Sequence, residues 1–264
     1  MRHQFRVLMA ALVCMAEPYA WAGEKMSTGD MKTDEIMVAL QEKSKTVSSC
    51  RARVKTLLHL EGEQFEILDD VYIQVLAKIY VSRVLAGEIN QTIVSDGSLM
   101  WRYDPEEKLV SRVNMGRVFR TTKVEADADQ PDLTRPFRTL DWTSIRYIKT
   151  ESVGGREYRV FEAGPGLTML HAELPQAPET VTLWIHPEDG LLRRARYYGT
   201  GEKELFSQEY LDVVINPKLD PQIFDFVVPS GVHVMDMTDD VIEILNSAKE
   251  TKGKESGADK AQGN

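Results

Sequence analysis

The side chains that could perform catalysis or bind a metal are scattered along this sequence. The chain contains five histidines, which are His3, His59, His171, His186 and His233. No two of them have the spacing of a metal-ligand pair. There is also no Gly-x-Ser-x-Gly nucleophile elbow and no phosphate loop ending in Gly-Lys-Ser/Thr. The sequence therefore predicts no catalytic residue, metal or cofactor, and an enzyme with a dispersed site is the alternative left open.

Adjacent carboxylates, which could work as an acid–base pair, occur at Asp69-Asp70 and Asp239-Asp240. Neighbouring residues on a strand point to opposite faces, so the first pair is poorly placed for joint chemistry. The second pair is explained by a helix N-terminus, which favours negative charge. Neither pair therefore supports catalysis.

The first residues have the pattern of a secretory signal. Arg2 and Arg6 precede a short apolar run over 7–16, and Ala20-Trp21-Ala22 offers small residues at the two positions that a signal peptidase reads. Cys14 follows Val13 inside the apolar run, whereas lipidation needs a small preceding residue. We predict cleavage after Ala22 and a periplasmic location.

Charge and cysteine content narrow the remaining function classes. The formal net charge is -9, and loss of residues 1–22 makes it more negative by one. Such an acidic chain repels phosphate backbones, so nucleic-acid binding is excluded. The mature chain keeps Cys50 as its single cysteine, which we expect to be a small buried hydrophobe.

Hydrophobic periodicity predicts a mainly β domain of the α+β class, over 33–249, between a mobile segment at 23–32 and a disordered tail at 250–264. Apolar residues at helical spacing predict a helix over 34–47, capped by Thr33 or Asp34. A last helix is expected over 239–249, capped by Thr238. Closely spaced alternating segments between turn residues predict antiparallel hairpins. These strands are expected at 50–60, 64–85 (with breaks at Asp69-Asp70 and Ala77-Lys78), 91–95, 99–103, 109–113, 145–150, 157–162, 180–186, 191–198 and 204–214.

An acidic, proline-containing insert at 121–136 interrupts the strand series. It leads into a short helix expected around Phe137 and Leu140, which are the candidate lid residues. An insert of this length between two strand series is a natural cover for a cavity.

Two sets of large apolar side chains alternate on predicted strands. Leu99, Trp101 and Tyr103 share one face of a strand, and Val181, Leu183 and Ile185 share a face of another. Either set can build an ordinary core or line a ligand cavity. For the first strand we expect the Trp101 face to look inward, because the opposite face carries Arg102, which belongs in solvent.

Three stretches resemble the outer-membrane lipoprotein carrier family (LolA and its relatives). They are 93–105 (IVSDGSLMWRYDP), 216–232 (NPKLDPQIFDFVVPSGV), and 181–185 (VTLWI) with the turn 187–190 (PEDG). The order of signal peptide, helix, strands, helical insert and strands is also similar, and the resemblance covers most of 34–236.

The resemblance implies a strongly curved, incomplete antiparallel β-barrel whose open side is covered by helices. It implies a monomeric, non-enzymatic periplasmic carrier that holds the acyl chains of lipoproteins in an apolar cavity. Its partners would be acylated lipoproteins or lipids, an inner-membrane lipoprotein-exporting ABC transporter as donor and an outer-membrane acceptor. A free-lipid carrier and an envelope-stress sensor domain of the same fold are the alternatives.

The sequence departs from the family pattern where the lid is latched. The family has a basic residue on an early strand that holds the lid closed. The matching stretch here is 78–83 (KIYVSR), and Lys78 and Arg83 are both candidates.

Overall fold

The architecture is taken from a computed structural model of the chain. The structure describes residues 27–60, 62–74, 78–85, 88–122, 133–137, 140–165 and 176–246. The predicted signal segment, most of the predicted insert and the predicted tail lie outside the described residues. Within the described ranges, no helix has the length and apolar composition needed to cross a membrane.

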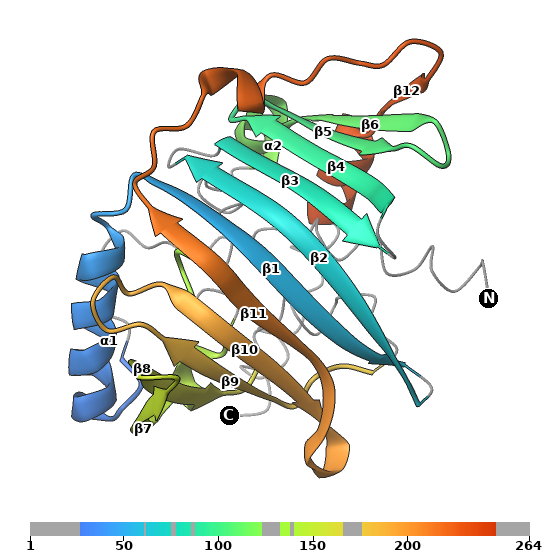
Figure 1. Cartoon of the computed structure of the whole chain (residues 1–264). Helices are drawn as coiled ribbons and strands as arrows, with labels where there is room; N and C mark the ends of the chain where they lie inside the picture. The colour runs from blue at the N-terminus through green and yellow to red at the C-terminus, as the bar shows by residue number, and fades with distance from the viewer. Residues whose placement is uncertain are drawn as a thin grey trace, which may run out of the picture.

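A single strongly curved sheet organises the described residues (Figure 1). Its strands are β1 (Ser49–Leu60), β2 (Glu63–Gln74), β3 (Lys78–Leu85), β4 (Glu88–Asp96), β5 (Leu99–Asp104), β6 (Leu109–Asn114), β7 (Arg146–Val153), β8 (Arg156–Ala163), β9 (Thr180–Ile185), β10 (Leu192–Gly199), β11 (Lys203–Ile215) and β12 (His233–Asp236). They lie in the order β12-β6-β5-β4-β3-β2-β1-β11-β10-β9-β8-β7. All neighbours are antiparallel except β12, which pairs in parallel with β6. The predicted fold class is confirmed.

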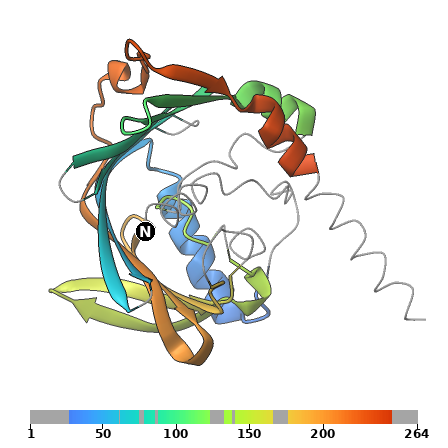
Figure 2. The same cartoon turned by 90° about the vertical axis from the view of Figure 1, so that its right-hand side faces the viewer.

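Five of the strand pairs contain a break in register. The β1–β11 pairing shifts between Arg51 and Arg53, opposite Asp212, which has a φ of 50°. Further shifts occur in the pairs β3–β4, β9–β10, β10–β11 and β7–β8. Bulges of this kind bend a strand and increase its twist, and the sheet therefore wraps around its contents as an open C (Figure 2).

Helix α1 (Met31–Ser44) lies inside the curve of the sheet (Figure 2). The predicted cap was wrong, because the side chain of Asp30 accepts the backbone N–H groups of Lys32 and Thr33 and starts the helix earlier. The Thr33 hydroxyl instead accepts the backbone N–H of Tyr147 on β7 at 3.0 Å. The cap residue expected from sequence is therefore an anchor that holds the helix to the sheet.

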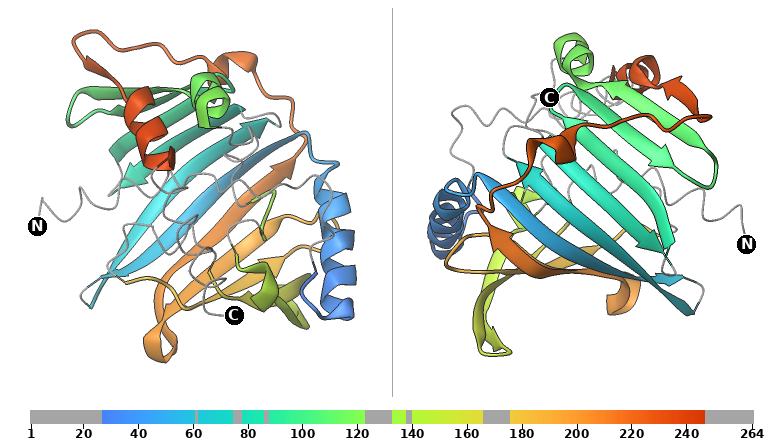
Figure 3. Two further views of the ribbon diagram at one scale, coloured as in Figure 1. Left: turned by 180° about the vertical axis from the view of Figure 1, so that it is seen from behind. Right: turned by 45° about the horizontal axis from the view of Figure 1, so that its top comes forward.

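Two further helices cover the other end of the curved sheet (Figure 3). Helix α2 (Met115–Thr122) was not predicted, and it begins where the Asn114 side chain accepts the backbone N–H of Arg117. The described part of the last helix spans 238–246. Thr238 does not cap it from outside, because its own N–H and hydroxyl both donate to Asp236. The two helices pack together with β5 and β6, through Val113, Val118, Val241, Leu245 and half-buried Met100.

The early strands depart from the prediction at one place. A break was expected at Asp69-Asp70, but β2 runs through both residues to Gln74. Each carboxylate is paired with an arginine on a neighbouring strand, Asp69 with Arg83 and Asp70 with Arg53. The charges are therefore accommodated within the sheet, and the strand does not end there.

Candidate functional site: the concave face of the sheet

The concave face of β1 to β4 carries a continuous apolar strip. Its buried members are Cys50, Ala52 and Val54 on β1, Val71 and Ile73 on β2, Val81 on β3 and Ile93 on β4. They alternate with polar or exposed positions, as expected for strands with one buried face. From outside these strands, the described residues that join the buried cluster are Val47, Leu133 and Leu191.

Part of this strip is only half-buried. Ile79, Met100, Tyr210, Val213 and Ile215 pack against the buried cluster and keep some exposure. Helix α1 covers a different part of the concave face, where Met37 and Leu40 pack on β8, β9 and β10. Among the described helices, α1 covers one end of the curve, and α2 together with 238–246 covers the other. None of these helices covers the apolar strip in the middle.

Polar side chains lie next to this apolar strip on the same face. Arg83 donates from Nε to Asp69 Oδ1 at 2.8 Å and from Nη2 to Asp69 Oδ2 at 3.0 Å. Gln91 is 2% exposed, and its amide is assigned the orientation in which the oxygen faces Arg102. In that orientation the oxygen accepts from Nη2 of Arg102 at 3.1 Å and also from Nε. Two arginines, one carboxylate and one amide thus form a polar group on β2 to β5.

The structure corrects the predicted orientation of the strand at 99–103. Trp101 stacks on Phe226, with ring centroids 5.6 Å apart, and Tyr103 lies 6.5 Å from the same ring. Phe226 belongs to the segment after β11, which includes the short helix η5 (Pro221–Phe224) over β3 and β4 on the convex side (Figure 3). The face that looks inward is that of Met100 and Arg102. Leu99 shares the outward parity of Trp101.

The second predicted set has the expected orientation but lies in a packed core. Val181, Leu183 and Ile185 are on the concave face, and none is more than 2% exposed. They pack with α1 and with Phe137, so an acyl chain can reach them only if those elements move. Their contact with cargo stays a prediction.

The candidate lid residues belong to the same core. Phe137 is 4.9 Å from the ring of Phe161 in an edge-to-face contact, and Leu140 forms an isolated bridge with Pro165. Residues 136–137 form a turn, and residues 138–139 lie outside the described residues. The helical part observed near the predicted helix is η3 (Trp142–Ser144).

The two latch candidates lie on opposite faces of β3. Arg83 shares the concave face with Val81, whereas Lys78 has the parity of the convex face. The concave orientation leaves Arg83 as the only one of the two that could touch a cover on the inside. The segment that it would latch lies largely outside the described residues.

The thiol of Cys50 lies within the apolar strip and is fully buried. Burial raises the pKa of this thiol to about 11, against a smaller opposing effect of Arg193. A thiol with this pKa is protonated and unreactive at neutral pH. Cys50 is therefore a small hydrophobe, as predicted. In the described ranges no group of three His, Cys, Asp or Glu side chains could hold a metal ion.

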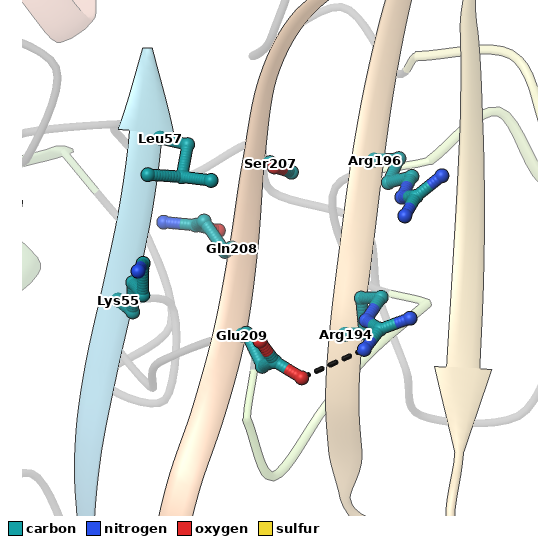
Figure 4. Close-up of a pocket in the computed structure, with 7 residues that line it drawn as sticks. All are labelled: Lys55, Leu57, Arg194, Arg196, Ser207, Gln208 and Glu209. Atoms are coloured by element: carbon teal, nitrogen blue, oxygen red, sulfur yellow. Dashed lines mark hydrogen bonds and ion pairs between the residues drawn. The ribbon is translucent and has the colours of Figure 1, made fainter. Parts of the chain in front are cut away.

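A shallow polar pocket lies among β1, β11 and β10 (Figure 4). It is lined by Lys55, Leu57, Arg194, Arg196, Ser207, Gln208 and Glu209. Its charges are paired across strands, with Arg194 2.7 Å from Glu209 and Lys55 2.6 Å from Glu66. The pocket has little apolar wall, and the concave face remains the better candidate site.

Sequence reasoning missed Asp69, Gln91 and Arg102 as inward-facing residues. A signal was present, because each lies two residues from an inward apolar residue, namely Val71, Ile93 and Met100. The common parity on three separate strands marks one face. The assignment of Arg102 to solvent obscured it.

No protein-family model matches the sequence, and no curated protein matches it either. Among solved structures, an uncharacterized conserved protein from Thermus thermophilus is similar with a TM-score of 0.52 and 13% identity, over 78% of this chain and 99% of that one. The lipoprotein LppX of Mycobacterium tuberculosis gives a TM-score of 0.46 at 14% identity, over 72% and 98%. A LolA superfamily protein from Nitrosomonas europaea gives 0.36 at 14%, over 74% and 97%. At these identities the likeness concerns the fold alone.

Proposed function

We propose that this chain is a non-enzymatic periplasmic carrier that binds acyl chains of lipoproteins or lipids on its concave face. The observation that carries the proposal is the apolar strip of β1 to β4, with half-buried aliphatic side chains at Ile79 and Met100. An aliphatic surface of this kind matches a hydrocarbon chain and offers no group for chemistry.

The energetics favour acyl chains over small polar ligands. Each methylene removed from water contributes roughly 0.8 kcal/mol, so contact with ten carbons contributes about 8 kcal/mol before the cost of ordering the chain. The resemblance of 93–105 and 216–232 to lipoprotein carriers points to the same cargo. Transfer onward then requires that one of the covers move, because the strip faces the inside of the curve.

A pair of neighbouring residues on β5 tests the proposed surface. Met100 faces the concave strip and Leu99 faces the opposite side, and both are half-buried. Met100→Gln keeps the length of the side chain but adds an amide to the proposed binding surface. We expect it to weaken binding of a fluorescent fatty acid about tenfold, whereas Leu99→Gln changes binding less than twofold.

Fluorescence titration of both purified variants, with their unfolding curves, makes the comparison. Equal effects of the two variants on affinity, at equal stability, would place the ligand elsewhere. Mass spectrometry of material purified from the native envelope then identifies the cargo: an acylated lipoprotein supports the lipoprotein carrier, and extractable lipid alone supports the free-lipid carrier. A signalling protein without lipid contradicts both and supports a sensor role.

A further inference from the structure

The polar group on the concave face forms one continuous set across four strands. Asp69 on β2 lies opposite Arg83 on β3, and Arg83 in turn lies opposite Gln91 on β4. On β5, Arg102 lies opposite Ile93, which is two residues from Gln91 on β4. The next inward residues along these strands are the apolar Val71, Val81, Ile93 and Met100. Two residues of a strand span about 6.6 Å, so polar and apolar side chains adjoin on one surface.

The two arginines of this group are satisfied unequally. Arg83 uses Nε and Nη2 on Asp69, which is 7% exposed. Arg102 uses Nε and Nη2 on the neutral oxygen of Gln91, and in the described part of the chain no carboxylate lies within 4.0 Å of it. The nearest acid along its own strand, Asp104, is engaged at the β5–β6 turn, where it accepts the backbone N–H of Glu107. Among the described residues, Arg102 therefore has no direct counter-ion and keeps N–H groups that donate to none of them.

The surroundings make this arrangement costly without an anion. Burial lowers the pKa of Arg102, and the positive charge of Arg83 adds to this effect while Asp104 opposes it. This guanidinium is partly removed from water, and within the described ranges its hydrogen-bond partner is an amide oxygen. It would gain from an oxyanion, because its planar fork matches carboxylate and phosphate geometry.

We propose that Arg102, positioned by Gln91 and flanked by Arg83, binds the anionic head group of an amphiphile whose acyl chain lies along the apolar strip. This inference rests on the proposed function and narrows it to cargo that carries a carboxylate or phosphate next to its hydrocarbon. The head group occupies the polar end of the inward face, and the chain follows toward Met100.

The experiment compares two probes that share one chain, cis-parinaric acid and its methyl ester. The full chain is titrated with each probe at low ionic strength, and fluorescence gives both dissociation constants. The acid should bind about tenfold more tightly than the ester, because only the acid forms a charge-assisted pair with Arg102. Arg102→Gln should remove this preference and leave ester binding unchanged. Arg53→Gln, which removes an arginine from the convex side of β1, should change neither value.

A second variant supplies the anion from the protein itself. Gln91→Glu places a carboxylate against the guanidinium of Arg102 without adding volume. It should abolish the preference for the acid and raise the melting temperature, while ester binding persists. Arg83 is not replaced, because its loss would leave Asp69 buried without a partner.

The outcomes separate the two proposals. If neither probe binds, the carrier function itself is wrong. If both probes bind equally to the wild-type chain, or if Arg102→Gln keeps the preference, the head-group site is wrong and the carrier function stands. Millimolar inorganic phosphate that displaces the acid without any binding of the ester would show a site for free oxyanions and overturn the inference. Competition by dodecyl phosphate against dodecanoate then tells which head group is preferred.

Discussion

Asp69 and Asp70 are neighbours on β2 whose side chains lie on opposite faces of the sheet. Asp69 pairs with Arg83 on the concave face, where both side chains are largely buried. Asp70 pairs with Arg53 on the convex face, where the two side chains are 43% and 51% exposed. An aspartate–arginine ion pair thus occurs in a buried and in a solvent-exposed environment, at adjacent positions of β2.

This difference predicts unequal effects of the same substitution. Asp69→Asn leaves Arg83 buried without its carboxylate, and we expect a loss of about 3–5 kcal/mol in the free energy of unfolding. Asp70→Asn removes an exposed pair, for which about 1 kcal/mol or less is expected. Chemical denaturation of the two variants measures both. Losses of equal size would mean that the concave pair is as well hydrated as the convex one.

The faces of individual residues were harder to predict from sequence than the strands themselves. The alternation of Leu99, Trp101 and Tyr103 fixed which residues share a face, but not which face turns inward. That choice depends on Phe226, which covers Trp101 from a segment more than a hundred residues later in the chain. A distant covering segment leaves no mark in the local pattern, so an arginine at position 102 favoured the wrong side.

At the scale of elements, the position of α1 depends on its contact with the turn between β9 and β10. Gly190 has a φ of 70°, and a Cβ on it would lie 2.1 Å from the backbone oxygen of Leu40 in α1. Gly154, in the β7–β8 turn, has a φ of 60° and nothing within 4 Å of such a Cβ. The two glycines share the left-handed backbone and differ in whether the helix lies against them.

We therefore expect alanine to act differently at the two turns. Gly154→Ala carries only the backbone cost, about 1 kcal/mol. Gly190→Ala carries that cost and must also displace α1, and we expect a loss greater by at least about 2 kcal/mol. Urea unfolding of both variants decides the matter. If Gly190→Ala were as mild as Gly154→Ala, α1 would rest loosely on this turn.

A second element-scale prediction concerns the attachment of β12 to β6. Hydrogen bonds from Thr238 and then from Arg112 lower the pKa of Asp236 from its ordinary 3.8 to about 2. Because the pKa in the folded state is depressed, the ionised Asp236 stabilises the fold above about pH 4. This contribution is lost as the pH falls through the folded pKa near 2.

Asp236→Asn tests this contribution. At neutral pH the variant should be less stable than the wild type by about 1 kcal/mol or less, because the side chain is 44% exposed. The difference should shrink between pH 4 and pH 2 in thermal unfolding curves. A difference that stays constant down to pH 2 would mean that the charge of Asp236 is not what holds β12.

Most elements could be predicted because their signals are local. Turn residues such as Asp96-Gly97 and 187–190 separate alternating segments, and β5, β9 and β10 lie within one or two residues of the expected positions. Helix α2 and strand β12 could not be predicted in this way. Both are short, and both depend on contacts between 109–118 and 233–245, which only the folded chain brings together.

At the scale of the whole molecule, one hydrogen-bonded sheet forms the body of the fold, and the helices cover parts of its concave face. Strand β1 pairs with β2 and with β11 in the middle of the sheet. Strands β1 and β2 also carry part of the apolar strip. Helix α1 lies over one end of the curve, and α2 with 238–246 lies over the other. Continuous ladders of backbone hydrogen bonds hold the sheet together, so we expect the covers, rather than the strands, to move when a ligand enters the strip.

This division predicts where the chain responds to cargo. Local opening requires least free energy where few backbone ladders hold an element, so the covers α1, α2 and 238–246 should exchange their amide hydrogens faster than β1 and β2. Addition of a saturating fatty acid should change exchange in at least one of these covers and leave the amides of β1 and β2 unchanged. Hydrogen–deuterium exchange with mass spectrometry measures both regions in one sample. The Met100→Gln variant, at a fatty-acid concentration too low to load it, is the matched control and should show no change in any region. Protection that appears first in β1 and β2, with the covers unaffected, would mean that the sheet itself opens to admit the chain and that the helices do not act as covers.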